Sequence, residues 1–487
     1  MSTLTSQFTL AIRRHIAPAH AYIQRLRAHV PYLVIIAFGA SVAQFFVLKQ
    51  HPLITLFPDS QDYLNEAQQI SGLHQIIFAY RPPVYPLFLA IILGLGGYNN
   101  LTLVVAVQAI FTVAAAFEIY VLAYRLTRHY FIACIIATLI GANLYIADWE
   151  RAVLTETLSY WLVVTLFLIG ERYVTAPRIG QMVWFGALSA VGILMRPSLL
   201  VLPAVVLLSL AAWMFWRKQL RQHWKTLVIA SVITYGSVLG YMVLDKIQNN
   251  YFGVSYVSNV NPFGKLIEYH MVDLNTDPRF AQMRADADTM MQSGKRSPWF
   301  LPRMFPDRNY QANYYAEMAA YTNEVVLHHP TTFVEHAVND IYAIWTAPPT
   351  AYTPFAASSK ITSLYLDISA WMLNSYFLLP ILLLLLAFRL RNDPDARQDV
   401  TLMIILIALA TNILFLAFTL YDEFYRLRST LDWGMILVGG ILLSRLLPAK
   451  FQQSSSTPPV ESNEQSGTAA GDGDLVPTLP RINAAQP

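Results

Sequence analysis

The stretch 58–92, PDSQDYLNEAQQISGLHQIIFAYRPPVYPLFLAII, follows the first hydrophobic run of the chain directly. It begins with two carboxylates, Asp59 and Asp62, and continues through polar, amphipathic sequence. It then turns at Tyr80-Arg81-Pro82-Pro83 and ends in a short apolar segment. An acidic group just beyond a membrane-length run, with a cation and an apolar helix nearby, indicates chemistry on a polar group that a lipid carries.

The composition around this stretch is that of a membrane protein. Of 487 residues, 55% are hydrophobic and only 13% are charged, and the mean hydropathy is +0.42. Soluble domains have about a quarter of their residues charged, and a helical span needs about 20 apolar residues. The sequence therefore predicts an all-α, polytopic membrane protein. Its single cysteine, Cys134, excludes an internal disulfide and a cysteine-rich metal site.

The apolar runs predict about ten spanning helices, within a range of nine to twelve. They are expected at 31–48, 101–124, 131–147, 153–170, 179–195, 198–216, 226–245, 367–389, 400–420 and 431–447. The run 84–97 is shorter than the length that a spanning helix needs, and it contains Pro86. It is therefore predicted to be a helix at the membrane surface.

The positions of lysine and arginine predict the orientation. With 84–97 left out of the spans, the basic cluster RKQLRQHWK at 217–225 falls on the same side as both termini. The positive-inside rule then places both termini in the cytoplasm. Counting 84–97 as a span would put that cluster outside.

Five regions follow from this topology. They are a cytoplasmic segment 1–30 without a cleavable signal peptide, a transmembrane core 31–245 that includes the outer loop 49–100, a mostly helical outer loop domain 246–366, C-terminal spans 367–447, and a disordered cytoplasmic tail 448–487. Near the end of the loop domain an amphipathic helix is expected, with its apolar face formed by Phe333, Ala337, Val338, Ile341 and Trp345.

The carboxylates of the first outer loop are the leading catalytic candidates. Pro58 can start a helix, on which Asp59, Asp62, Tyr63 and Glu66 share one face. Asp59 could act as a general base for an acceptor hydroxyl. The simpler alternative is a helix cap followed by solvated acids.

A second acidic group lies in a short outer turn. Asp148, Glu150 and Arg151 connect two predicted spans, and Glu156 follows within the next one. Ionisable residues inside a span are costly and are functional candidates for that reason, although Glu156 could simply join neighbouring helices by hydrogen bonds.

Five arginines are predicted to face the same side. A guanidinium group binds phosphate with several donors at once, and ordinary contact with lipid headgroups is the alternative for each of them. Arg196 is distinguished by Pro197, which fixes it at a helix break. The five are Arg81, Arg151, Arg196, Arg426 and Arg428.

Other site types are not supported. The histidines lack metal-ligand spacing, and the chain contains no phosphate-binding Walker loop, dinucleotide fingerprint or serine elbow. A divalent cation, Mg²⁺ or Mn²⁺, is left open, and no nucleic-acid partner is expected.

Several ordered pieces together resemble one known group. They are Asp59-Ser-Gln-Asp-Tyr63, Tyr80-Arg-Pro-Pro-Val-Tyr85-Pro, Thr155-Glu156, Met195-Arg-Pro197 and the late arginine-containing turn. The chain resembles integral-membrane glycosyltransferases of the GT-C fold, and more narrowly the bacterial relatives of protein O-mannosyltransferases and lipid A aminoarabinose transferases. The paired Asp-Glu of those relatives is Asp59-Ser60 here, so a second carboxylate would have to come from Asp62 or Asp148.

The resemblance implies a function. Such enzymes transfer a sugar from a polyprenyl-phosphate carrier to an acceptor hydroxyl of a lipid, glycan or protein, with inversion, at the outer face of the bacterial inner membrane. Asp59 would be the catalytic carboxylate, helped by Asp62 or Asp148. The resemblance implies that the lipid phosphate and the substrate bind to a common set of residues: Arg81, Tyr63, Tyr85, Glu150, Arg151, Glu156, Arg196, Arg426 and Arg428.

Three other functions remain open from the sequence. A transporter or flippase would need polar residues at mid-membrane and internal symmetry, neither of which the sequence displays. A polysaccharide ligase or polymerase also uses outer arginines, but it does not call for the first-loop carboxylate. A structural scaffold is the third.

Overall fold

A computed structural model describes residues 27–305, 312–349, 355–393, 396–421 and 424–447. These residues are helical, and their only β pairing is an isolated bridge between Thr55 and Ala152. The predicted all-α class is confirmed. The predicted tail 448–487 and most of the segment 1–30 lie outside the described residues.

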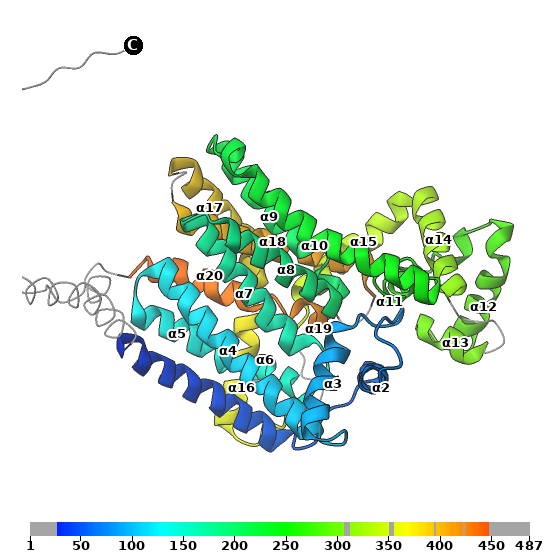
Figure 1. Cartoon of the computed structure of the whole chain (residues 1–487), viewed down its shortest axis with the longest axis horizontal. Helices are drawn as coiled ribbons and strands as arrows, with labels where there is room; N and C mark the ends of the chain where they lie inside the picture. The colour runs from blue at the N-terminus through cyan, green and yellow to red at the C-terminus, as the bar shows by residue number, and fades with distance from the viewer. Residues whose placement is uncertain (1–26, 306–311, 350–354, 394–395, 422–423, 448–487) are drawn as a thin grey trace, which may run out of the picture. The chain divides into compact units, whose positions relative to one another are not determined.

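The first half of the chain begins with the helix Arg27–Gln50 (Figure 1). Pro58 then takes the first position of α2, where a missing N–H group costs nothing, and Ser60 Oγ accepts a hydrogen bond from the Phe57 N–H at 2.9 Å. The helices are α2 Pro58–Ser71, α3 Val84–Gly96, α4 Leu101–Thr127, α5 Tyr130–Gly141, α6 Leu144–Asp148, α7 Glu156–Thr175, α8 Ile179–Met195, α9 Val201–Trp216 and α10 Leu220–Asn249.

The second half first forms the predicted loop domain and then returns to the bundle. Its helices are α11 Val257–Glu268, α12 Ala281–Gln292, α13 Leu301–Met304, α14 Ala312–His328, α15 Pro330–Thr346, α16 Lys360–Leu373, α17 Leu379–Asn392, α18 Arg397–Thr419, α19 Phe424–Arg428 and α20 Trp433–Ser444.

Each predicted span falls on a helix or a helix pair, but the count of about ten is not confirmed. By length and apolar composition, six described helices could cross a membrane, or seven if the bent pair Tyr130–Gly141 and Leu144–Arg151 is one span. The run predicted to lie at the surface is the short apolar helix α3. The chain is a multi-pass membrane protein.

The bundle core joins distant parts of the sequence. Helix α4 packs on α5 and α7, α8 packs on α7 and α10, and α18 packs on α9, α17 and α7. One large apolar cluster runs through these contacts, with Phe185 and Trp433 among its fully buried side chains. A second cluster, which includes Tyr63 and Tyr85, packs α2 and α3 against the start of α7.

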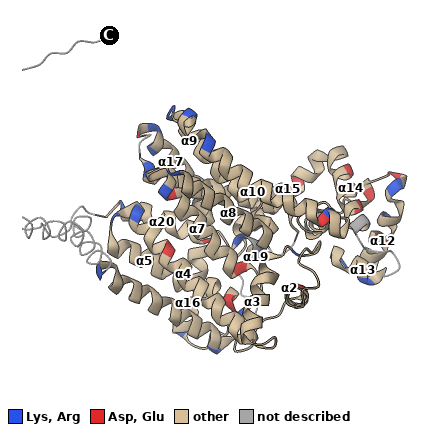
Figure 2. Ribbon diagram, viewed as in Figure 1, with Lys and Arg blue, Asp and Glu red and all other residues tan. Residues whose placement is uncertain are grey.

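Many of the basic residues lie at one end of the bundle, around α9, α17 and α20, and others lie elsewhere, for example near α12 (Figure 2). Arg397 at the start of α18 donates to the Thr175 carbonyl at the end of α7. Arg389 and Arg445 both pair with Asp399, at 2.7 and 2.5 Å. The loops predicted to face the cytoplasm therefore meet at the end of α7 that is opposite to Glu156.

The amphipathic helix of the loop domain is present as α15, but its predicted face is partly wrong. Phe333 and Ala337 are buried as expected, whereas Val338 is 53% exposed and Asp340 and Ile344 are buried. Asp340 is tolerated inside because it pairs with the fully buried Lys265 of α11 and accepts a hydrogen bond from Tyr269. The described residues form one compact unit that ends at Leu447, and the predicted division into core and loop domain stays a prediction.

Candidate active site

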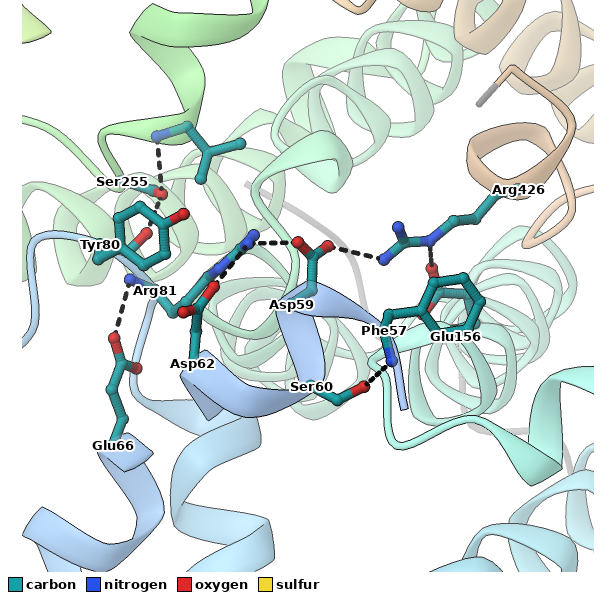
Figure 3. A network of polar contacts seen from close by, with 11 residues as sticks. Phe57, Asp59, Ser60, Asp62, Glu66, Tyr80, Arg81, Glu156, Ser255 and Arg426 are labelled. Atoms are coloured by element: carbon teal, nitrogen blue, oxygen red, sulfur yellow. Dashed lines mark hydrogen bonds and ion pairs between the residues drawn. The ribbon is translucent and has the colours of Figure 1, made fainter. Parts of the chain in front are cut away.

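Charged side chains from five separate segments meet where α2 and α7 begin and α8 ends. Figure 3 shows the part of this network that surrounds Asp59. We call this group the carboxylate–arginine cluster. It consists of Asp59 and Asp62 of α2, Arg81 of the following loop, Glu156 of α7, Arg196 after α8, and Arg426 of α19. All six belong to loops and helix ends that the sequence places on one side of the membrane.

Asp59 lies between two guanidinium groups. Its Oδ1 is 2.6 Å from Arg81 Nη2, and its Oδ2 is 3.1 Å from Arg426 Nη2. Asp62, one turn further along α2, lies 3.4 Å from the same Arg81 nitrogen. The side chains of Asp59 and Asp62 are 29% and 32% exposed, so both carboxylates can be reached from outside the protein.

Arg81 is held in place by its own backbone and by aromatic rings. Glu66 Oε1 accepts a hydrogen bond from the Arg81 N–H at 3.2 Å. The guanidinium lies over the rings of Tyr63 and Tyr80, at 5.2 and 4.9 Å from their centroids. Ser255 fixes the turn by donating to the Tyr80 carbonyl at 2.5 Å.

Glu156 joins the other two arginines. Its Oε1 accepts from Arg426 Nε and lies 3.4 Å from Arg196 Nη1. Arg196 also donates from Nε to Ser198 Oγ at 3.1 Å, and Arg426 stacks over Phe57, 5.4 Å from the ring centroid. Glu156 thus holds Arg196 and Arg426 together beside Asp59.

Burial and the arginines shift the pKa values of the three acids of α2 in different directions. Burial alone would raise the pKa of Asp59, but Arg81 and Arg426 outweigh it and hold that pKa below its usual range. Burial raises the pKa of Asp62 despite the opposing effect of Arg81. It raises the pKa of Glu66 to about 9, so Glu66 is protonated at neutral pH. Asp59 is therefore the acid of this face that is best kept ionised.

The two predicted tyrosines lie beneath the cluster. Tyr63 is 5% exposed and meets the ring of Tyr85 edge-on at 4.9 Å. Tyr85 is fully buried and donates from its hydroxyl to Gln108 Oε1 at 2.8 Å. The two rings pack α2 against α3.

The second predicted acidic group does not join the cluster through any described contact. Asp148 and Glu150 are 9% and 3% exposed, and Glu150 Oε1 lies 3.5 Å from Gln44 Nε2. Arg151 donates to the Pro52 carbonyl at 2.6 Å. Their predicted roles at the site stay predictions.

Arg428 is placed differently from the other arginines. It is fully buried, lies 3.1 Å from Asp432, and donates to the Ile344 carbonyl at 2.6 Å. Its guanidinium also lies 4.5 Å from the centroid of the Tyr376 ring. This geometry favours a role in holding the turn, and the predicted phosphate contact stays a prediction.

The cluster does not have the donor set of a metal site. In the part of the chain that the structure describes, no three His, Cys, Asp or Glu side chains gather as ligands. Asp59 and Asp62, which Mg²⁺ or Mn²⁺ would use, both point at Arg81. These residues as arranged do not fit a cation.

Sequence reasoning missed Phe57, Ser255 and Ser198, which position the arginines. Phe57 directly precedes Pro58, so its place at the helix start could have been noticed. Ser255 reaches Tyr80 across 175 positions, and nothing in the local pattern indicates that contact.

Part of the chain matches a known family. Residues 80–241 match a family model described as dolichyl-phosphate-mannose-protein mannosyltransferase. The predicted resemblance to GT-C membrane glycosyltransferases is confirmed. The matched stretch contains Arg81, Glu156 and Arg196, whereas Asp59 and Arg426 lie outside it. Comparison with curated protein sequences gives no match.

Two solved structures are similar over most of the chain. AglB from Archaeoglobus fulgidus, an archaeal oligosaccharyltransferase in complex with an inhibitory peptide and a dolichol-phosphate, is 15% identical with a TM-score of 0.46. That match covers 86% of this chain and 51% of AglB, so the chain spans about half the length of that relative. ArnT from Cupriavidus metallidurans, bound to undecaprenyl phosphate, is 14% identical with a TM-score of 0.36, covering 80% of this chain and 77% of ArnT.

Proposed function

We propose that this protein transfers a sugar from a polyprenyl-phosphate carrier to an acceptor hydroxyl. The observation that carries the proposal is the position of Asp59, an accessible carboxylate between Arg81 and Arg426 at the surface end of a membrane bundle. An ionised acid beside several guanidinium groups suits a reaction in which a hydroxyl attacks and a phosphate leaves. The family match over 80–241 supports the same class of reaction.

The proposed step is a single displacement at the anomeric carbon. The acceptor oxygen forms a bond to that carbon while the bond from the carbon to the phosphate oxygen breaks. The electron pair of the broken bond leaves with the lipid phosphate, and the anomeric centre inverts. Positive charge develops on the sugar in the transition state, as in other glycosyl transfers.

Asp59 would accept the hydrogen bond, and finally the proton, of the attacking hydroxyl. Its lowered pKa keeps it charged at neutral pH, which orients the acceptor and stabilises positive charge on the sugar. A weakly basic carboxylate takes the proton late, when the acceptor oxygen has already lost electron density to the new bond.

Arg81, Arg196 and Arg426 would bind the leaving phosphate. Guanidinium groups match phosphate oxygens with several donors, and here two of them also neutralise Asp59 when no donor is bound. Donor binding would exchange those ion pairs for phosphate contacts. Asp62 remains the nearest second carboxylate, and Tyr63 and Tyr85 support the helix.

The proposed reaction takes place on the outer face of a bacterial inner membrane. The basic loops at the other end of the bundle would then face the cytoplasm together with both termini. The acceptor is a lipid, a glycan or a protein, because no described feature selects among them.

The direct test uses the purified full-length protein in detergent with radiolabelled polyprenyl-phosphate sugars and a membrane extract as acceptor source. We expect the wild type to release polyprenyl phosphate and to label an acceptor from one donor. Asp59→Asn should do neither, at equal expression and melting temperature. Equal activity of the two proteins would remove Asp59 from the mechanism, and lipid movement across vesicles without sugar transfer would replace the proposal with a flippase.

A further inference from the structure

A small buried cavity with a partly polar lining lies against Glu156. It is enclosed by the start of α7, the short η1 turn Trp149–Arg151, the α19 turn and the start of α20. Its lining combines hydroxyl groups, carboxylates and an indole. None of the sequence candidates except Glu156 lines it.

Six polar atoms of this lining have no hydrogen-bond partner in the structure. Each belongs to a side chain that is less than a tenth exposed. They are Trp149 Nε1, Glu156 Oε2, Thr157 Oγ1, Tyr160 Oη, Tyr425 Oη and Asp432 Oδ2.

Six buried polar atoms without hydrogen-bond partners in one cavity indicate that a bound molecule supplies the missing hydrogen bonds. Each buried polar group without a partner is costly, and six together would cost an amount comparable with the whole stability of a domain. The set is also complementary to a hydroxylic molecule. The indole can only donate, the two carboxylates accept, and the three hydroxyls can do either.

The size of the cavity decides which molecule fits. The centre of a water-sized molecule has about 10 Å³ available, which is roughly the room that one buried water requires. A sugar ring does not fit into that space. A single water can make two to four hydrogen bonds and can therefore satisfy up to four of the six orphaned atoms.

We propose that this cavity is a specific water site that joins Glu156 to Asp432. By holding Glu156, the water positions Arg196 and Arg426, two of the three arginines of the cluster. Glu156 Oε1 is already used by Arg196 and Arg426, and the water holds Oε2. Asp432 Oδ1 is used by Arg428 and Tyr376, and the same water holds its Oδ2. The link to phosphate binding rests on the proposed function, whereas the water site itself does not.

Thr157 and Tyr160 are positioning residues in this arrangement. Tyr160 lies one helical turn after Glu156 on the same face of α7, and Thr157, the next residue along the helix, also lines the cavity. Without the water, Glu156 could turn Oε2 toward other partners and release Arg426 from its place beside Asp59.

The first experiment is a high-resolution structure of the full-length protein in a lipid nanodisc, for the wild type and for Thr157→Val and Tyr160→Phe. We expect a water within hydrogen-bond distance of Glu156 Oε2 and Asp432 Oδ2 in the wild type, and its loss or displacement in both variants. An empty cavity in the wild type, or a water that does not touch Glu156, would overturn the proposal.

The second experiment measures binding of undecaprenyl phosphate, which carries no sugar, to the same proteins. We expect Thr157→Val and Tyr160→Phe to weaken binding about three- to tenfold, the effect of losing one hydrogen bond between neutral groups. Ser159→Ala is the matched control, because Ser159 is a fully buried hydroxyl of α7 that has no partner but does not line the cavity. It should bind like the wild type.

The results separate this inference from the proposed enzyme. Equal affinity of Thr157→Val, Tyr160→Phe and the Ser159→Ala control would refute the coupling between water and arginines. Normal binding of undecaprenyl phosphate without sugar transfer would instead count against the proposed function and leave the water site in place.

Discussion

Asp59 combines two properties that rarely occur together in a protein: it is largely enclosed, yet it is held in its charged form. Burial opposes the charge, and Arg81 and Arg426 restore it. Each arginine pairs with a different oxygen of the carboxylate, so both are needed to neutralise it from two sides. The charge state of Asp59 therefore depends on two segments that are far apart in the sequence.

Replacing Asp59 with asparagine should lower the rate of sugar transfer by about 10²- to 10⁴-fold, the usual contribution of a positioned acid–base group. The amide keeps the shape of the side chain but can neither take a proton nor neutralise the two arginines. Initial rates with a saturating labelled donor measure the effect.

Asp62→Asn provides the comparison, since Asp62 lies on the same helix face with similar exposure, and its described ion pair is with Arg81. It should retain at least about a tenth of the activity. A larger loss for Asp62→Asn than for Asp59→Asn would exchange their assigned roles.

Glu66 should make the stability of the protein depend on pH. Its pKa rises from 4.5 to about 9 on folding, so the folded chain binds this proton more tightly than the unfolded chain. The stabilisation is complete below about pH 4.5 and is lost as the pH rises toward 9. Glu66→Gln, which stays neutral, should show a melting temperature that falls less between pH 5 and 9.

The matching experiment is thermal unfolding in detergent at several pH values, for the wild type, Glu66→Gln and Glu324→Gln. Glu324 is a glutamate of α14 outside the cluster and controls for the loss of one carboxylate. Parallel melting curves of the wild type and Glu66→Gln across this range would show that Glu66 is ionised in the folded protein.

Residue-level prediction from sequence succeeded where a single helix was sufficient. Pro58 and the three-to-four spacing were enough to put Asp59, Asp62, Tyr63 and Glu66 on one face. The pairing of Asp59 with Arg426 spans 367 positions and depends on how α18 and α20 pack. No local pattern contains that information, so the sequence could place Arg426 on the right side but could not choose its partner.

At the scale of elements, α15 shows that a buried charged residue can make a prediction of the buried face from apolar spacing wrong. The expected face included Val338, which is exposed, and left out Asp340, because aspartate is normally counted as a surface residue. Asp340 lies inside instead, paired with Lys265 of α11. One ion pair therefore rotates the buried face of α15 relative to its apolar pattern.

Breaking this pair from one side should be costly. Lys265→Met leaves Asp340 buried without its cation and should lower the free energy of unfolding by about 3–5 kcal/mol. The double variant Lys265→Met/Asp340→Leu should recover most of that loss, since it removes both charges. Denaturant titration of the purified variants gives both values, and a double variant no more stable than the single one would contradict this account of α15.

At the scale of the whole molecule, the cluster is complete only when the last helices have docked. Asp59 and Arg81 belong to the first outer loop, Glu156 and Arg196 to the middle of the bundle, and Arg426 to α19. The order of helices along the chain was predictable from apolar runs and basic loops. The number of true crossings was not, because α7, α8 and α20 are shorter or more polar than a simple span.

Two truncations test this assembly. A chain that ends at Leu447 keeps every member of the cluster and should retain wild-type activity. A chain that ends at Asn392 keeps Asp59 and Arg81 but lacks α18, α19 and α20, and it should be inactive even where it is inserted. Transfer activity per inserted molecule is the measurement, and activity of the shorter chain would show that Arg426 is dispensable.

The 367 positions between Asp59 and Arg426 also set a delay during synthesis. At roughly 5–20 residues per second, a ribosome needs roughly 20–70 seconds to travel from one to the other. Throughout that interval the first outer loop is already made, but its carboxylate lacks one of the two cations that hold its charge. The nascent protein therefore passes through a period in which Asp59 is a weaker acid than in the finished protein, and the site acquires its final electrostatics only in the last moments of translation.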